Sequence, residues 1–287
     1  MKISHWGLKR SALCAIAPLI MVGCAQEQAV IRPQASAPVT SAATPAAATT
    51  PRDAKSILMS MAAFLAQTPR FSVNLTSIYE VVQESGQKIE FGESRRIIVS
   101  RPDKLRVEVE HSDGEKHLVL YDGKEITTYS PNQNVYAQVA KPGGIDEAIT
   151  YFLKDLHMRL PLAALLLSRF PAELERRTLS LDYVEKLSLN GITVHHLAGR
   201  TETVDYQIWI PEISQPLPLS VVLTYKNAEG QPSYRAQFSD WNLAPEIPDN
   251  QFAFTPPEGA RKIAFLAQLP QIALEGASKP EKSGEQK

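Results

Sequence analysis

Alternation of apolar and polar side chains runs through most of this 287-residue chain and constrains its fold more than any other feature. It is clearest over residues 105–110, where Leu, Val and Val alternate with Arg, Glu and Glu. Asp122-Gly123 and Asn190-Gly191 lie between such segments, and both dipeptides favour tight hairpin turns. Segments of this kind form antiparallel strands with one buried face. The chain is therefore expected to be rich in hairpins.

Two segments instead repeat their apolar residues with the period of a helix. One runs from Asp53, a plausible N-cap, towards Pro69, which stops it. The other begins near Ile145 and carries acidic residues at its start, where negative charge is favourable. The very apolar residues 161–167 follow and are expected to be buried.

The order of these elements is helix, strands, helices, strands. Few strands are separated by helices of crossover length, so a parallel sheet is not expected. We predict an α+β fold with one large curved antiparallel sheet, an open half-barrel, and a few helices packed on its concave face. Curling would limit the twist of so many strands and protect their edges.

Composition narrows the possible functions. The formal net charge of -1 gives no reason to expect nucleic-acid binding. The two cysteines, Cys14 and Cys24, both precede the expected folded part. That part therefore has no disulfide, thiol nucleophile or cysteine-based metal site.

The N-terminus has the layout of a secretory signal. Basic residues precede a short apolar run that ends at Val22, and Gly23 and Cys24 follow. A cysteine at the cleavage point resembles a bacterial lipoprotein signal, in which the thiol is lipidated. An ordinary signal peptide and an uncleaved anchor are the alternatives, although the apolar run is short for a membrane span.

Composition also sets the expected boundaries. Residues 1–23 are the predicted lipoprotein signal peptide, and residues 24–52 are the lipidated cysteine and a disordered tether of Ala, Pro and Thr. Residues 53–274 are the predicted folded domain, followed by a flexible tail over residues 275–287.

Few residues look catalytic. His195 and His196 are neighbours in a predicted strand, so their rings point to opposite faces and cannot form a joint site. There is no Gly-rich phosphate loop, no His-x-x-x-His pair and no Gly-x-Ser-x-Gly elbow. The chain is therefore expected not to be an enzyme and to need no metal or cofactor. A hydrolase of envelope polymers remains a third hypothesis, resting on location alone.

Glu93-Ser94-Arg95-Arg96 forms a charged patch within an otherwise apolar strand. It could lie at a barrel mouth and meet an anionic headgroup. The alternative is a solvated strand segment that pairs with Glu108 or Glu110 across the sheet.

Several motifs together carry a family resemblance. Residues 101–108 (Arg-Pro-Asp-Lys-Leu-Arg-Val-Glu) and 120–124 (Leu-Tyr-Asp-Gly-Lys) resemble the strand entries of the bacterial lipoprotein-carrier fold. Trp209-Ile210-Pro211 and residues 252–260 continue the pattern in the same order. The chain is similar to domain-of-unknown-function family 2092, a group of predicted periplasmic proteins, over most of its length.

The resemblance implies a half-barrel with a helical lid over an apolar cavity that holds acyl chains. It implies a membrane-anchored envelope lipoprotein, at the periplasmic face of the outer membrane, that binds lipid or lipoprotein. The alternative is an envelope stress sensor or scaffold that binds a protein partner through the same fold. The candidate cavity residues are Phe71, Tyr79, Val107, Val109, Tyr206 and Trp209.

Overall fold

The computed structural model describes residues 51–265 except 159 and 190. Its helices are α1 (Pro51–Gln67), α2 (Ile145–Lys154) and α3 (Phe170–Arg177), with short 3-10 helices η1 (Ala163–Leu166) and η2 (Asp249–Phe252). Cys24, the signal peptide, most of the tether and the tail lie outside the described residues.

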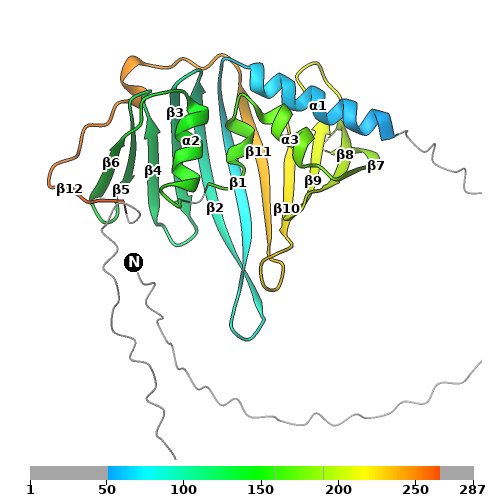
Figure 1. Cartoon of the computed structure of the whole chain (residues 1–287), viewed down its shortest axis with the longest axis horizontal. Coiled ribbons are helices and arrows are strands. Elements are labelled where there is room, and N and C mark those ends of the chain that lie inside the picture. The colour runs from blue at the N-terminus through cyan, green and yellow to red at the C-terminus, as the bar shows by residue number, and fades with distance from the viewer. Residues whose placement is uncertain (1–50, 159, 190, 266–287) are drawn as a thin grey trace, which may run out of the picture. The chain divides into compact units, whose positions relative to one another are not determined.

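Twelve strands form one sheet in the described part of the chain (Figure 1). In chain order they are β1 (Arg70–Val82), β2 (Lys88–Ser100), β3 (Lys104–His111), β4 (Lys116–Tyr121), β5 (Glu125–Ser130), β6 (Val135–Ala140), β7 (Ser180–Leu189), β8 (Ile192–Arg200), β9 (Val204–Pro211), β10 (Ser220–Tyr225), β11 (Ser233–Asn242) and β12 (Arg261–Lys262).

The sheet consists of two meanders. Strands β1 to β6 follow one another as antiparallel neighbours, and so do β7 to β11. The antiparallel pair β1–β11 joins the two meanders, with Asn74 opposite Ser239 and Tyr79 opposite Tyr234. The chain between the meanders carries α2, η1 and α3.

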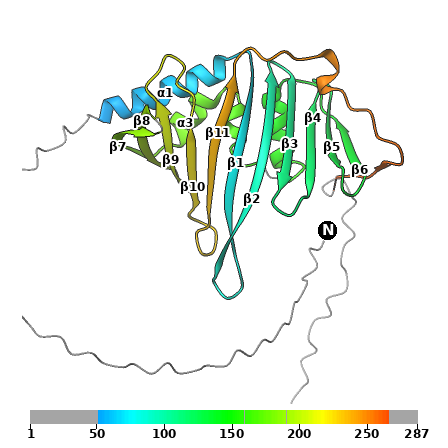
Figure 2. The same cartoon turned by 180° about the vertical axis from the view of Figure 1, so that it is seen from behind.

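The helices cover one face of the sheet, which we call the helix face. They lie in front of the strands in Figure 1 and behind them in Figure 2. Leu58, Met61 and Leu65 of α1 are buried against this face, as their helical spacing predicted. Ile145, Ile149 and Phe152 of α2 belong to the same core, so both predicted helices are confirmed as amphipathic.

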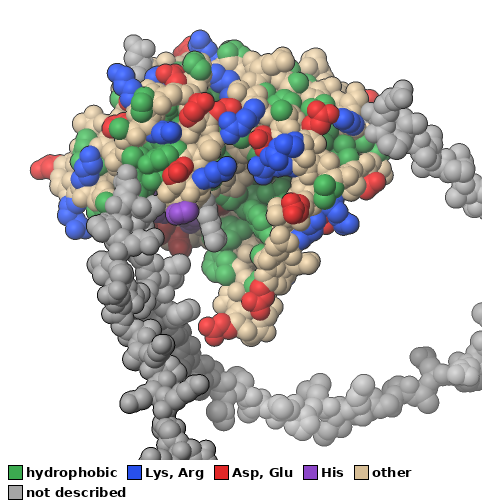
Figure 3. All heavy atoms as spheres, viewed as in Figure 1, with side chains coloured by type: hydrophobic (Ala, Val, Ile, Leu, Met, Phe, Trp, Pro, Cys, Tyr) green, Lys and Arg blue, Asp and Glu red, His purple; other side chains and the backbone are tan. Residues whose placement is uncertain are grey.

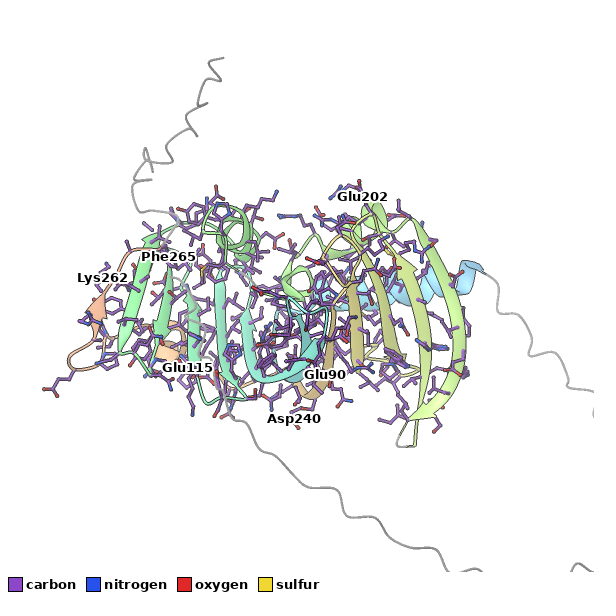
Figure 4. All side chains as sticks on the ribbon, turned by 90° about the horizontal axis from the view of Figure 1, so that it is seen from below. Glu90, Glu115, Glu202, Asp240, Lys262 and Phe265 are labelled. Carbon is purple, nitrogen blue, oxygen red and sulfur yellow. The ribbon has the colours of Figure 1, made fainter. Side chains whose placement is uncertain are left out.

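The predicted α+β class and large open antiparallel sheet are confirmed, but the sheet is not curled as a half-barrel. Each edge is protected separately, which removes the need for closure. At one edge, β12 adds two residues parallel to β6; Figure 4 shows Lys262 and Phe265 there. At the other edge, β7 has an irregular register between Tyr183 and Glu185, and Lys186 follows it.

Three other details differ from the sequence-based expectations. Helix α1 begins at Pro51, so Asp53 lies within its first turn and is not its N-cap. The sequence patterns did not predict α3, a helix of only 8 residues. They also did not predict β6 or the very short β12.

The close packing of the Tyr206 ring of β9 on Gly199 of β8 gives a test of the sheet. A Cβ atom on Gly199 would lie 2.0 Å from Cζ of Tyr206, whose ring is buried against it. We expect Gly199→Ala to lower the free energy of unfolding by about 1–3 kcal/mol, because the ring must move. Urea unfolding followed by circular dichroism measures the change.

Gly92→Ala in β2 is the matched control, because its Cβ would meet no atom closer than 3.8 Å. An equal loss of stability in both variants would contradict the packing described for Tyr206.

Candidate functional site

An apolar covering segment, residues 160–167, lies over the centre of the helix face. Its sequence is Leu-Pro-Leu-Ala-Ala-Leu-Leu-Leu, and Ala163 and residues 165–167 are buried, as predicted for this stretch. Beneath it is an apolar interior that we define by the side chains of Leu65, Phe71, Val73, Leu75, Ile97, Phe238 and Trp241. The segment therefore takes the position of a lid over the sheet.

The apolar interior is filled. Its free cavity volume is about 10 Å³, which is about the space of one water molecule. Binding sites for small molecules typically have about 300–1,000 Å³. The cavity expected from the sequence is therefore closed, and the side chains of the covering segment occupy its space.

Two arginines of the sheet hold the backbone of the covering segment. Arg101, just after β2, donates from Nη1 to the Leu166 carbonyl oxygen at 2.8 Å, and from Nε to the Thr68 carbonyl oxygen at 3.2 Å. Arg95 of β2 donates from Nη1 to the Pro161 carbonyl oxygen at 3.1 Å. Burial lowers the pKa of Arg101, while the charge of Asp146 acts to raise it.

The end of the segment is tied to helix α2. The Asp146 carboxylate accepts hydrogen bonds from the backbone N–H and the hydroxyl of Ser168, each at 2.8 Å. Between the ties, Leu162 has a φ of 64°, in the left-handed region. That conformation costs a residue with a Cβ about 1–2 kcal/mol. The closed position therefore combines polar ties with local backbone strain.

A buried polar cluster of Ser77, Glu93, Arg95, His111 and Tyr234 lies beside the apolar interior. Arg95 Nη2 lies 2.6 Å from Glu93 Oε1, which also accepts a hydrogen bond from the Tyr234 hydroxyl at 3.1 Å. That hydroxyl is 2.8 Å from Ser77 Oγ, and His111 Nδ1 is 3.8 Å from Glu93 Oε2. The carboxylate and guanidinium neutralise each other in a nearly dry setting.

The charged patch predicted at residues 93–96 is thus divided between the two faces of β2. Glu93 and Arg95 are buried on the helix face, while Ser94 and Arg96 are exposed on the opposite face. Arg96 stands opposite Glu108 in register, so the solvated alternative holds for this half of the patch. The headgroup interpretation is not supported for Arg95 as a free cation, because Glu93 already balances its charge.

The six candidate cavity residues are not brought together. Phe71 and Val107 are buried in the packed core. Tyr79 and Val109 are half-buried, on the part of the helix face near the polar cluster. Tyr206 lies beneath the end of α3, where its hydroxyl is 2.9 Å from Thr178 Oγ1.

Trp209 lies on the opposite face, and the prediction that it lines the same cavity is wrong. Its ring stacks on His196 at a centroid distance of 4.1 Å. His195 instead lies on the helix face, 3.0 Å from the Tyr183 hydroxyl. The two histidines therefore point to opposite faces, as predicted.

The roles of Arg101 and Arg95 in holding the covering segment were not predicted. Arg101 binds the Leu166 carbonyl, 65 residues away in the chain, and Arg95 binds the Pro161 carbonyl, 66 residues away. The available signals were the apolar composition of residues 161–167 and the unusual position of Arg95 in an apolar strand. Neither signal indicates that Arg95 and residues 161–167 would be in contact.

Apolar side chains continue beyond the covering segment on the projecting β1–β2 hairpin. Val81, Ile89 and Phe91 are 38%, 39% and 40% exposed. Tyr79 stacks on Phe91 at 5.9 Å. Figure 3 shows hydrophobic side chains gathered where this hairpin leaves the body of the domain. We call Tyr79, Val81, Ile89 and Phe91 the hairpin patch.

A larger hollow of about 660 Å³ lies on the opposite face, and most of the residues around it are polar or charged. Its charged groups largely satisfy one another: Arg106 binds Glu108 at 2.7 Å, and Lys116 lies 3.5 Å from Glu110. Asp240, which accepts a hydrogen bond from Asn74 beside this hollow, lies on the side away from α2 in Figure 4. Because the charged side chains of this hollow already pair with one another, the hollow is a weaker candidate for a binding site than the apolar interior.

Within the described residues, no cluster of three or more His, Cys, Asp or Glu side chains could hold a metal ion. No helix in the same part of the chain is long and apolar enough to cross a membrane.

Residues 54–266 match the sequence profile of the family described as predicted periplasmic protein (DUF2092). The chain belongs to this family. The resemblance noted from its motifs is therefore confirmed. No curated protein matches the chain.

Solved structures with a similar fold share little sequence with it. An uncharacterised conserved protein from Thermus thermophilus has 12% identity and a TM-score of 0.43, covering 74% of this chain and 99% of that one. Lipoprotein LppX of Mycobacterium tuberculosis has 13% identity and a TM-score of 0.41, covering 67% and 97%. A LolA superfamily protein from Nitrosomonas europaea has 12% identity and a TM-score of 0.32, covering 70% and 97%.

The buried polar cluster gives a prediction for high pH. Burial is the main cause that raises the pKa of Tyr234 from 10.0 to about 12. Because the folded state holds this proton more tightly, its contribution to stability is complete below pH 10 and is lost as the pH rises towards 12. The loss should approach about 2–3 kcal/mol.

Tyr234→Phe is the comparison, measured by urea unfolding between pH 8 and 12. We expect the variant to be less stable at pH 8 by about 1–3 kcal/mol, because it lacks the hydrogen bonds to Ser77 and Glu93. Its stability should fall less steeply above pH 10. Parallel pH curves for the two proteins would contradict the assignment.

Proposed function

We propose that this chain is a non-enzymatic binding protein of the cell envelope that takes up acyl chains of lipid or lipoprotein. The ligand would lie between the sheet and the covering segment, in the space that residues 160–167 now fill. The observation that supports this proposal is the filled apolar interior beneath a strained segment. Arg95, Arg101 and Asp146 hold that segment by hydrogen bonds.

Burial of the acyl chain supplies the driving force for such binding. An acyl chain gains about 0.8 kcal/mol for each CH₂ group that leaves water. Leaving the closed position breaks the hydrogen bonds to Pro161 and Leu166, and it relieves the strain at Leu162. The ligand replaces apolar contacts of the covering segment with its own, so opening and uptake are coupled.

The proposed anchor is a lipid on Cys24, which would hold the mature chain at the periplasmic face of the outer membrane. The periplasmic description of the family supports the compartment. An anchored protein of this kind suits a resident or receiving role more than that of a free carrier.

Arg101→Met tests the covering segment. It removes the hydrogen bonds to the Leu166 and Thr68 carbonyls. If this costs the closed state about 1.4 kcal/mol, apparent affinity for an apolar probe should rise about tenfold, because the open state becomes more populated. Fluorescence titration with diphenylhexatriene, a hydrocarbon without polar groups, measures the affinity.

Arg70→Met is the control, since Arg70 is an exposed residue at the start of β1. Its affinity should equal that of the wild type. If neither the wild type nor Arg101→Met binds the probe, the proposed acyl site is refuted.

A second candidate function, an envelope sensor or scaffold that binds a protein partner, is favoured by the hairpin patch. Three apolar side chains at 38–40% exposure on one side of a projecting hairpin are suited to a protein contact. This surface stays open while the apolar interior is closed, so it needs no movement of the covering segment.

Crosslinking in cells separates the two candidates. We expect the triple variant Val81→Ser, Ile89→Ser, Phe91→Ser to lose a crosslinked protein partner while keeping diphenylhexatriene binding, if the hairpin patch is a protein contact. Ile78→Ser is the control, because Ile78 is 43% exposed on the other face of the same strand. A partner retained in full by the triple variant excludes the hairpin patch as its contact.

A further inference from the structure

Arg95 has a hydrogen-bonding capacity that the closed structure does not use. The residue is 6% exposed, and its Nε is buried without a hydrogen-bond partner among the described residues. Its Nη2 binds Glu93 at 2.6 Å, and its Nη1 binds the Pro161 carbonyl at 3.1 Å. Burying an unused donor is costly, which suggests that the guanidinium has another partner in a second state.

The position of Arg95 is that of a headgroup site. In β2 it follows Phe91 and Glu93 on the helix face and precedes Ile97, which lines the apolar interior. Its neighbours in register are Leu75 of β1 and Val109 of β3. The polar cluster therefore separates the closed apolar interior from the open hairpin patch. A ligand chain in the interior would place its polar end beside Arg95.

Uptake of a ligand would remove the present partner of Arg95. When the covering segment leaves, the Pro161 carbonyl leaves with it, and Nη1 joins Nε as an unsatisfied donor. A ligand with a hydrogen-bond acceptor beside Arg95 would replace the lost Pro161 carbonyl. An entirely apolar ligand would leave both donors buried and unpaired.

The charge balance decides which acceptor fits. Glu93 already neutralises Arg95, and its carboxylate is also bound by Tyr234. A ligand carboxylate or phosphate would add a second negative charge next to Glu93. The His111 ring also lies near Glu93, with Nδ1 3.8 Å from Oε2. The group that leaves is a neutral carbonyl oxygen, so a neutral carbonyl is its closest substitute.

We propose that Arg95 is a specificity-determining residue whose guanidinium binds the ester or amide carbonyl of an acyl ligand in place of the Pro161 carbonyl. This proposal rests on the proposed acyl-binding function and narrows its ligand class. Acyl glycerides and acylated proteins offer the ester, and N-acylated proteins offer the amide. Free fatty acids, which end in a carboxylate, are disfavoured.

The test uses the full-length protein, freed of detergent, and four fluorescent probes at pH 8. They are cis-parinaric acid, its methyl ester, its methylamide and diphenylhexatriene. We expect the wild type to bind the methyl ester or the methylamide about tenfold more tightly than the acid. The preferred carbonyl, ester or amide, indicates the source of the natural ligand.

The test variant is Arg95→Met combined with Glu93→Gln, which removes both charges and leaves no buried ion unpaired. The advantage of the ester or amide over the acid should be lost, and the ratio of their affinity to that for diphenylhexatriene should drop about tenfold. Diphenylhexatriene itself should bind at least as tightly as to the wild type, because the variant also lacks the hydrogen bond that ties the Pro161 carbonyl. Arg96→Met is the matched control, since Arg96 is the next residue of the strand and is exposed on the opposite face. It should behave as the wild type.

The failures are distinguishable. If the ratio of ester affinity to diphenylhexatriene affinity is the same in the wild type and the double variant, Arg95 is not a headgroup site, but the acyl-binding function stands. A wild type that prefers the acid also overturns the proposal. Absence of binding for all four probes overturns the acyl-binding function and the headgroup site together. Unfolding curves for each variant confirm that the folded state is compared.

Discussion

The pairing of β1 with β11 is the contact on which the rest of the structure depends. It brings together strands about 160 positions apart in the sequence, with Asn74 opposite Ser239. Every other antiparallel pair joins strands that follow each other in the chain. Because this one pair merges two meanders, it creates a continuous floor wide enough to need a cover. The chain that connects the meanders carries α2, η1 and α3, and it supplies that cover.

The chain covers its own apolar floor with an apolar segment. The contacts of residues 160–167 with the sheet are non-directional, and the proposed function depends on an acyl chain providing the same kind of contact. The directional ties are few and come from charged groups, namely Arg95 in β2, Arg101 just after it and Asp146 in α2. Buried charges are usually a weak source of stability, and their use here is better understood as a means of placing the segment.

Much of the fold could be predicted because alternation and turn dipeptides are local signals. The hairpin turn at Asp122-Gly123 was correctly placed, as were the amphipathic faces of α1 and α2, and β7 and β8 pair as the second hairpin predicted. Short elements such as α3 and β12 were missed because a few residues carry little periodic signal. The curling of the sheet was overestimated, since its edges are protected by β12 and by the irregularity in β7.

The six candidate cavity residues were chosen without full use of a simple rule, that side chains alternate between the two faces of a strand. Tyr206 and Trp209 are three positions apart in one strand, so they must point to opposite faces. Phe71 and Tyr79 are eight positions apart and share a face, but α1 and the covering segment bury Phe71 and leave Tyr79 half-exposed. Parity is a property of the sequence, whereas the depth of a side chain depends on what packs above it.

The sequence by itself determined most of the strands, the two main helices, the family and the absence of cysteine from the folded part, because these follow from local pattern and composition. The tertiary structure alone decided that the apolar interior is filled, that residues 160–167 fill it, and that Arg95 and Glu93 are buried as a pair. Those features depend on which distant segments meet, and the free energy of such contacts comes from packing and from the removal of water, which no local pattern encodes.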